Sequence, residues 1–214
     1  MHVGASPTWE TMWAAGLKPG DKFDVGSASA TLVGCLARDS YAKAGARALV
    51  PGCGRAYDAL ALARHGFDEV VALDLAPTAV EAAKAFVASE ADAAAPKVRC
   101  VTGDFFEHAE GQYDFIWDCT FLCALDPSVR TRWAEQQRKL LAPGGVLAAC
   151  VFPICEKVGG PPYALTPDLV SGLLTPTGLA CEVVAVPDAE RHIPGAMKGG
   201  DLPGTKLLLA RAPA

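Results

Sequence analysis

The stretch Ala48–Leu62, ALVPGCGRAYDALAL, changes character twice. An apolar run stops at Pro51, a glycine-rich turn follows, and an Ala/Leu segment with helical periodicity begins. This order predicts a buried strand, a tight turn and a helix. Glycine accepts a positive φ and lets another group come close to the backbone, so we expect Gly52 and Gly54 to border a ligand site. The small Cys53 between them is expected to be structural rather than a nucleophile.

Further apolar runs follow the first along the chain. They are apolar almost continuously rather than in alternation, which is typical of strands covered on both faces of a parallel sheet. Helices are expected to open between them at Pro77, Pro127 and Pro167, and APGG at 142–145 to end the second of these helices. The alternation from residue 46 to about 174 predicts a doubly wound α/β sheet. The expected strands are 46–50, 69–75, 98–102, 113–118, 146–152, 181–186 and 206–210.

The last two runs differ from the others because no helical pattern separates them. Only Pro/Gly-rich chain (IPGAMKGGDLPG) joins them, so we expect these two strands to pair antiparallel. The predicted fold is therefore a seven-stranded sheet with five parallel strands and an antiparallel C-terminal hairpin. A chain of 214 residues suits one domain, predicted to span 1–214, with an N-terminal segment 1–40 before a core of 41–214.

Composition and charge exclude several function classes. With 19 basic and 24 acidic residues the net charge is -5, so we expect no nucleic-acid partner. No apolar run reaches transmembrane length and the start MHVGASPTWE lacks the features of a signal peptide, which favours a cytoplasmic protein without a membrane partner. The eight cysteines contain no CxxC pair, so reduced thiols are expected and no metal site.

Two aspartates follow neighbouring strands and indicate what the glycine turn binds. Asp74 ends the second strand, about 20 residues beyond the turn, where a carboxylate can accept both hydroxyls of a ribose. Asp104, in GDFF after the third strand, can accept from an adenine amino group. Together they predict an adenosine-containing ligand. The alternative is a tight turn, a helix-capping aspartate and a loop aspartate without a ligand.

Six sequence blocks carry a likeness to a known family. VPGCGRAYD, VVALDLAPTAVEAAK, GDFFE, YDFIWDCTFLCALDP, LLAPGGVLAACVFPI and GGPPYALTPD occur in this order between Trp9 and Val186. Together they resemble the thiopurine methyltransferase superfamily, and most closely its thiol, thiocyanate and halide ion methyltransferases. The resemblance implies a Rossmann-like class I methyltransferase fold. It also implies S-adenosylmethionine as the cofactor and S-adenosylhomocysteine as its product.

The resemblance also implies roles for individual residues. Trp9 and Trp13 match tryptophans that fold over the cofactor, and aromatic faces attract its sulfonium cation, so segment 1–40 would cover the cofactor. The alternative is a helix that packs two rings. The residues expected to bind the cofactor are Trp9, Trp13, Phe23, Gly52, Gly54, Asp74, Leu75, Asp104, Phe105 and Cys119.

Tyr163, in GGPPY, matches a tyrosine at the substrate end of the family's site, and we expect its hydroxyl to be the catalytic, orienting group. With Phe23 and Phe121 it would line the acceptor pocket. Cys119 stands where a tyrosine is common in the plant enzymes, which removes a hydroxyl. The segment LKPGDKFDVG replaces their Thr-Pro-Trp-Asp, and the tail lacks their Arg-rich ending.

The predicted reaction moves a methyl group to a soft nucleophile (a thiol, hydrosulfide, thiocyanate or halide) by in-line displacement. The protein then mainly aligns the reactants and removes water. His65, His108 and His192 could act as bases, although surface or capping roles are commoner for such residues. For the acceptor, a thiopurine, an aromatic thiol or a metalloid stays open as an alternative. For the protein class, the alternatives are a nicotinamide dehydrogenase and a non-catalytic cofactor-binding module. A monomer is expected.

Overall fold

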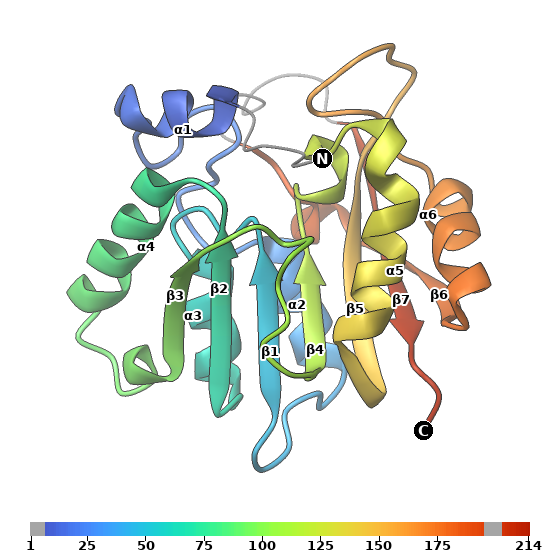
Figure 1. Ribbon diagram of the computed structural model, residues 1–214, viewed down its shortest axis with the longest axis horizontal. Coiled ribbons are helices and arrows are strands. Elements are labelled where there is room, and N and C mark those ends of the chain that lie inside the picture. Colours follow the sequence, from blue (N-terminus) through green and yellow to red (C-terminus); the bar gives the residue numbers. More distant parts are fainter. Residues whose placement is uncertain (1–6, 195–202) are drawn as a thin grey trace.

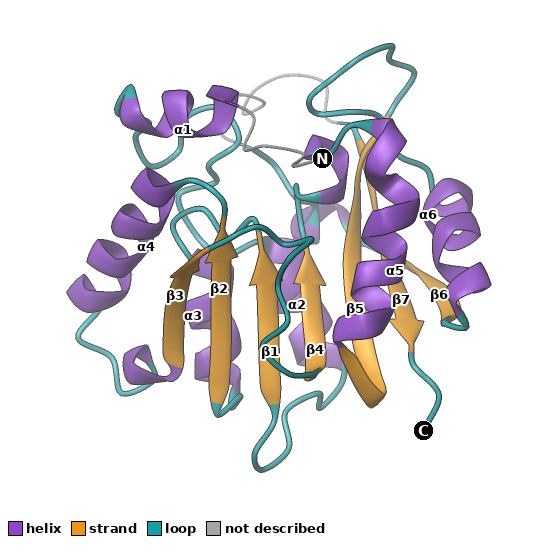
Figure 2. Ribbon diagram, viewed as in Figure 1, coloured by secondary structure: helices purple, strands orange, loops and turns teal. Residues whose placement is uncertain are grey.

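The computed structural model describes residues 7–194 and 203–214. Seven strands form one sheet in the order β3-β2-β1-β4-β5-β7-β6, with helices on both of its faces (Figures 1 and 2). The strands are β1 Arg47–Pro51, β2 Glu69–Asp74, β3 Val98–Thr102, β4 Tyr113–Asp118, β5 Leu141–Ile154, β6 Ala180–Ala185 and β7 Gly204–Arg211. The α-helices are α1 Pro7–Ala14, α2 Ala30–Arg38, α3 Tyr57–His65, α4 Pro77–Ser89, α5 Arg130–Leu140 and α6 Pro167–Leu174.

Strand directions confirm the predicted fold class. The five strands β3, β2, β1, β4 and β5 are parallel to their neighbours. β7 runs antiparallel to β5 on one side and to β6 on the other, so the last strand lies inside the sheet and β6 forms its edge. Within the described residues, no helix is long and apolar enough to cross a membrane.

Several boundaries differ from the sequence prediction, each for a local reason. The helix expected to open at Pro127 begins at Arg130, because Pro127–Val129 forms a short 3-10 turn. Strand β5 begins at Leu141 rather than 146: Leu141 already pairs with Tyr113, and residues 142–145 form an irregularity in the ladder. Helix α2 was not predicted, and β3 joins β4 without a helix.

The core has two layers, one on each face of the sheet. Helices α2, α3 and α4 contribute buried residues such as Leu32, Leu62 and Val87 to one layer. Helices α5 and α6 contribute Trp133 and Leu174 to the other. Strand residues alternate between the two layers and are buried on both sides, which explains why the strands read as continuous apolar runs. At the carboxyl ends of the strands, α1 lies beside α4 above the edge of the sheet (Figure 1).

Candidate functional site

The glycine turn after β1 packs against two aromatic rings. Gly52 has φ +62°, and a β-carbon there would lie 2.6 Å from a ring carbon of Phe121. Gly54 has φ +51°, and its β-carbon would lie 3.4 Å from a ring carbon of Trp13. Both positions therefore need glycine for backbone conformation, and Gly52 also needs it for space.

Asp74 joins this turn to the end of β2. Its Oδ2 accepts a hydrogen bond from the Gly54 N–H at 2.9 Å, and its Oδ1 accepts one from the Ala76 N–H at 3.0 Å. Burial raises the pKa of Asp74, while these N–H groups lower it. The pairing of Asp74 with the turn, which the sequence spacing predicted, is present. Burial also raises the pKa of the neighbouring Cys53 thiol well above its usual value, which supports a structural role.

The loop after β3 lies next to this pair. The Gly103 N–H donates to the Asp74 carbonyl oxygen at 2.9 Å, and Asp104 Oδ1 accepts from the Phe106 N–H at 2.9 Å. The Phe105 ring is buried, with its centroid 5.1 Å from that of Phe121. The loops after β1, β2 and β3 thus form one continuous surface at the carboxyl ends of the strands.

The N-terminal segment covers this surface with an aromatic cluster of Trp9, Trp13 and Phe23. The Phe23 ring centroid lies 5.6 Å from Trp9 and 6.0 Å from Trp13. Helix α1 is held in place through Glu10, whose carboxylate accepts from the Thr78 N–H at 3.2 Å at the start of α4. Trp9 and Trp13 belong to α1, and Trp13 faces Gly54, so the cluster lies where α1 meets the glycine turn.

The sequence reasoning missed an ion pair that fixes the cover to the core. Asp24 is buried, and its carboxylate accepts from Arg55 Nε at 2.9 Å and from the Gly26 N–H at 2.7 Å. The Arg55 guanidinium also lies 5.2 Å from the centre of the Trp13 ring. Arg55 directly follows GCG in the sequence, but nothing in the sequence pattern links it to a carboxylate in the loop before α2.

The three residues expected to line the acceptor pocket lie in different places. Phe121 packs on Gly52, and Phe23 belongs to the aromatic cluster over Gly54. Tyr163 is held by its backbone N–H, which donates to the Cys123 carbonyl oxygen at 2.7 Å. Among the described residues, no recorded ring contact joins Phe23 to Phe121 or Tyr163. A shared acceptor pocket therefore stays a prediction.

Cys119, just beyond β4, belongs to a buried polar cluster that the sequence did not indicate. Its Sγ lies 3.4 Å from His192 Nδ1, which is 3.2 Å from Ser29 Oγ. Asp58 accepts from the Ser29 N–H at 2.7 Å and thereby fixes that residue. Burial lowers the pKa of His192 to about 4, so the imidazole is neutral near pH 7.

The other two histidines that could act as bases lie elsewhere. His108 is buried, with Nε2 2.7 Å from the Tyr113 hydroxyl, and burial lowers its pKa. His65 ends α3, at the opposite end of that helix from the glycine turn. The His192 side chain contacts Cys119, whereas His108 contacts Phe105 through its backbone N–H, which donates to the Phe105 carbonyl oxygen at 3.3 Å.

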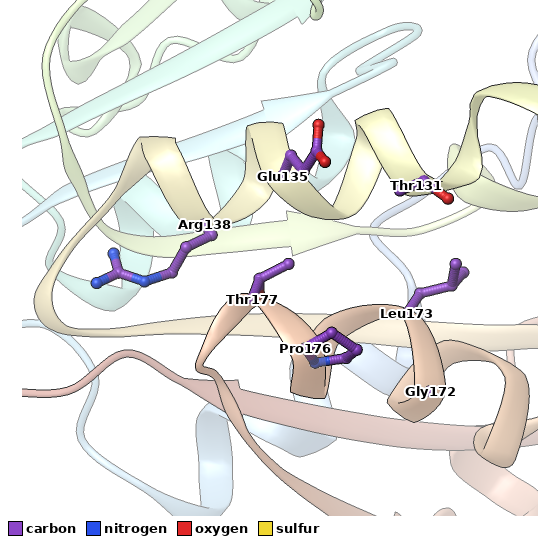
Figure 3. Close-up of a pocket in the computed structure, with 7 residues that line it drawn as sticks. All are labelled: Thr131, Glu135, Arg138, Gly172, Leu173, Pro176 and Thr177. Carbon is purple, nitrogen blue, oxygen red and sulfur yellow. The ribbon is translucent and has the colours of Figure 1, made fainter.

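A groove between α5 and α6 lies apart from this surface (Figure 3). It is lined by Thr131, Glu135, Arg138, Gly172, Leu173, Pro176 and Thr177. None of these residues belongs to the loops after β1, β2 or β3, so the groove is not the candidate site. Among the described residues, no group of His, Cys, Asp or Glu side chains could hold a metal ion.

The glycine turn, the Asp74 carboxylate and the aromatic cluster fit the cofactor expected from the sequence. The turn offers a close backbone approach, and Asp74 keeps acceptor capacity on both oxygens for ribose hydroxyls. Trp9, Trp13 and Phe23 bring aromatic rings together beside the turn, and aromatic rings attract a sulfonium. Which of these residues bind the cofactor stays a prediction.

The chain is similar to known methyltransferases in sequence and in fold. The chain is 38% identical over 204 residues to "Probable thiol methyltransferase 2" of Arabidopsis thaliana, covering 93% of this chain and 84% of that protein. It is 35% identical over 175 residues to "Thiocyanate methyltransferase 1" of Brassica oleracea, covering 79% and 72%. Among solved structures, a TehB-like SAM-dependent methyltransferase from Corynebacterium glutamicum matches with TM-score 0.58 and 20% identity, covering 97% and 95%, which shows a shared fold.

The family comparison covers most of the chain. Residues 5–198 match the model of the protein family "Thiopurine S-methyltransferase (TPMT)". The chain therefore belongs to the thiopurine S-methyltransferase family and is an S-adenosylmethionine-dependent methyltransferase.

Proposed function

We propose that this methyltransferase acts on a small soft nucleophile: a thiol, hydrosulfide, thiocyanate or halide ion. The observation that carries the proposal is the aromatic enclosure of the glycine turn by Trp13 and Phe121. Such a surface stabilises a sulfonium and removes water from an anion without supplying a nucleophile of its own. The names of the two plant relatives, a thiol and a thiocyanate methyltransferase, support the same acceptor class.

Residues of this chain would hold the cofactor at three points. Asp74 would accept the ribose hydroxyls, and Asp104 with Phe105 would contact the adenine. The turn at Gly52 and Gly54 would take the amino-acid part. Trp9, Trp13 and Phe23 would cover the sulfonium, and Leu75 and Cys119 would border it.

The chemistry requires little from the protein beyond positioning. When bound, the cofactor supplies an activated methyl group. An anionic acceptor brings its own electron pair, so no side chain has to remove a proton from it. Phe121 and Tyr163 would align the acceptor with the methyl group and exclude water, with the Tyr163 hydroxyl as the orienting group.

Calorimetric titration with S-adenosylhomocysteine tests the cofactor half of the proposal. Wild type should bind it, and Asp74→Ala should bind about 100-fold more weakly, because two hydrogen bonds to a charged group are lost. Ala14→Ser, a surface change at the end of α1, serves as a control and should bind like wild type. Binding that is equal in Asp74→Ala and wild type would remove Asp74 from the site.

Transfer of a labelled methyl group across a panel of acceptors tests the acceptor half. The panel holds iodide, thiocyanate, hydrosulfide, an alkyl thiol and thiophenol. Turnover with the small anions supports the proposal. Turnover with thiophenol alone would show an aromatic thiol methyltransferase, and binding without any turnover would show a cofactor-binding module.

A further inference from the structure

Arg130, the first residue of α5, is a buried cation that forms no ion pair within the described part of the chain. It is only 9% exposed, and its Nε and Nη2 atoms are fully buried. Within residues 7–194 and 203–214, the structure gives neither atom a hydrogen-bond partner. A buried guanidinium is always charged, and its burial is costly unless something pairs with it.

Two carboxylates that precede Arg130 in the chain are already engaged in hydrogen bonds. Asp126 accepts from the N–H and hydroxyl of Ser128, at 2.9 and 2.6 Å. Asp118 accepts from Trp133 Nε1 at 2.8 Å and from the Leu122 N–H at 3.0 Å. Neither carboxylate forms a recorded ion pair with Arg130.

The thiol nearest to Arg130 does not supply a charge either. Burial raises the pKa of the Cys123 thiol far above its usual value, so it stays protonated. The Nε and Nη2 groups of Arg130 therefore gain no partner from this thiol.

Arg130 also lies beside the acceptor end of the candidate site. Its guanidinium carbon is 5.7 Å from the centre of the Tyr163 ring. That ring packs on Gly160, where a β-carbon would lie 2.5 Å from a ring carbon, and the Tyr163 N–H donates to the Cys123 carbonyl oxygen. Cys123 belongs to the short 3-10 turn directly after Phe121, which covers Gly52. Arg130 and the glycine turn are thus joined through consecutive contacts.

We propose that Arg130 binds the anionic methyl acceptor through its guanidinium group, beside Tyr163, and so determines the preference for anions. The inference rests on the proposed function and adds the group that recognises the acceptor's charge. Weakly hydrated anions such as thiocyanate and iodide suit this position, because guanidinium is itself weakly hydrated and the aromatic neighbour favours loss of water.

Charge changes during the reaction predict which kinetic constant Arg130 affects. The acceptor's negative charge diminishes as its electron pair forms the new bond to carbon and the sulfonium bond breaks. Arg130 should therefore stabilise the bound anion more than the transition state. Its removal should raise KM for the anion and leave kcat equal or higher.

The experiment compares Arg130→Gln, Arg130→Met and Arg130→Lys with wild type. Arg138→Gln is the matched control, since it removes one positive charge two turns further along the same helix, in the groove of Figure 3. KM for thiocyanate should rise about 10- to 100-fold in the Gln and Met variants, the loss expected for a hydrogen bond to a charged group. It should rise less in the Lys variant and stay unchanged in the control. Affinity for S-adenosylhomocysteine should stay within about twofold of wild type in all four, since Arg130 is not assigned to the cofactor.

Perchlorate, a weakly hydrated anion that is a very poor nucleophile, supplies a second readout that needs no variant. It should compete with thiocyanate in wild type, and the competition should weaken in Arg130→Met. An unchanged KM in variants that bind S-adenosylhomocysteine normally, or no competition by perchlorate in wild type, would overturn the inference. If wild type methylates thiophenol but no anion, the proposed function fails first and this inference fails with it.

Discussion

The proposed site has two halves, which differ in how far apart in the sequence their contacting residues are. The cofactor half lies at the ends of β1, β2 and β3. The proposed acceptor half lies beyond β4 and β5. In the first, Asp74 and Gly54 are 20 residues apart, within one strand–helix–strand unit. In the second, the Tyr163 N–H donates to the carbonyl oxygen of Cys123, which is 40 residues earlier in the chain. Short-range contacts keep their geometry when distant segments change. The acceptor half can therefore vary while the cofactor half stays constant.

The largest expected effect is on the cofactor half. Gly52→Ala should weaken S-adenosylhomocysteine binding by about 100-fold, because the new β-carbon displaces Phe121 and the position has a positive φ. Gly45→Ala is a matched control: it also has a positive φ, +80°, but nothing lies within 4 Å of its β-carbon. Calorimetry should show normal binding for Gly45→Ala. Equal losses in both would mean that strain in the backbone, not the ring contact, is responsible.

The next effect concerns pH and the buried cluster of His192, Cys119 and Ser29. His192 titrates near 6.5 when unfolded, but burial lowers its pKa to about 4 in the folded protein, so the unfolded chain binds more protons between these values. The free energy of unfolding should therefore fall as pH drops from 6.5 to 4, by about 3 kcal/mol from this group.

His192→Gln should remove this contribution, and urea denaturation at several pH values measures the difference between the two proteins. All other titrating groups are shared and largely cancel in that difference. Parallel stability curves for wild type and His192→Gln would show that the imidazole does not titrate in this way.

The smallest effect is expected for the Tyr163 hydroxyl. Tyr163→Phe should raise KM for the acceptor about fivefold, the loss of one hydrogen bond worth about 1 kcal/mol, and leave S-adenosylhomocysteine binding unchanged. Tyr41→Phe, which removes a hydroxyl from a ring packed on Phe115 in the core, should leave KM unchanged. A change in cofactor affinity for Tyr163→Phe would place Tyr163 in the cofactor half and remove the proposed division.

The fold was largely predictable because its strands are buried on both faces. Strands at 98–102 and 113–118 begin and end where the apolar runs do, and the position of Asp74 beside the glycine turn follows from topology. Helix α2 was missed because it contains Gly34, where Glu190 packs so closely that a β-carbon would clash with its carboxylate. In the sequence, Gly34 indicates the interruption of a helix. In the structure, the close packing of Glu190 explains why this helical position is a glycine.

The candidate site was less predictable, since its charged groups pair across distant segments. The Asp24–Arg55 ion pair and the His192–Cys119 contact depend on how loops pack above the sheet. Arg130 is in the polar first turn of α5, and the sequence of this turn resembles that of a solvent-exposed helix. Its burial depends on the Tyr163 loop, which comes from beyond β5.

The position of β7 has a consequence for synthesis on the ribosome. Because β7 lies between β5 and β6, residues 180–185 have no strand to pair with until residues 204–211 have been made. Until then the nascent chain exposes the unpaired edge of β5 and a free strand, both able to pair with another chain. A released chain that ends before residue 204 should therefore aggregate more readily than the full chain.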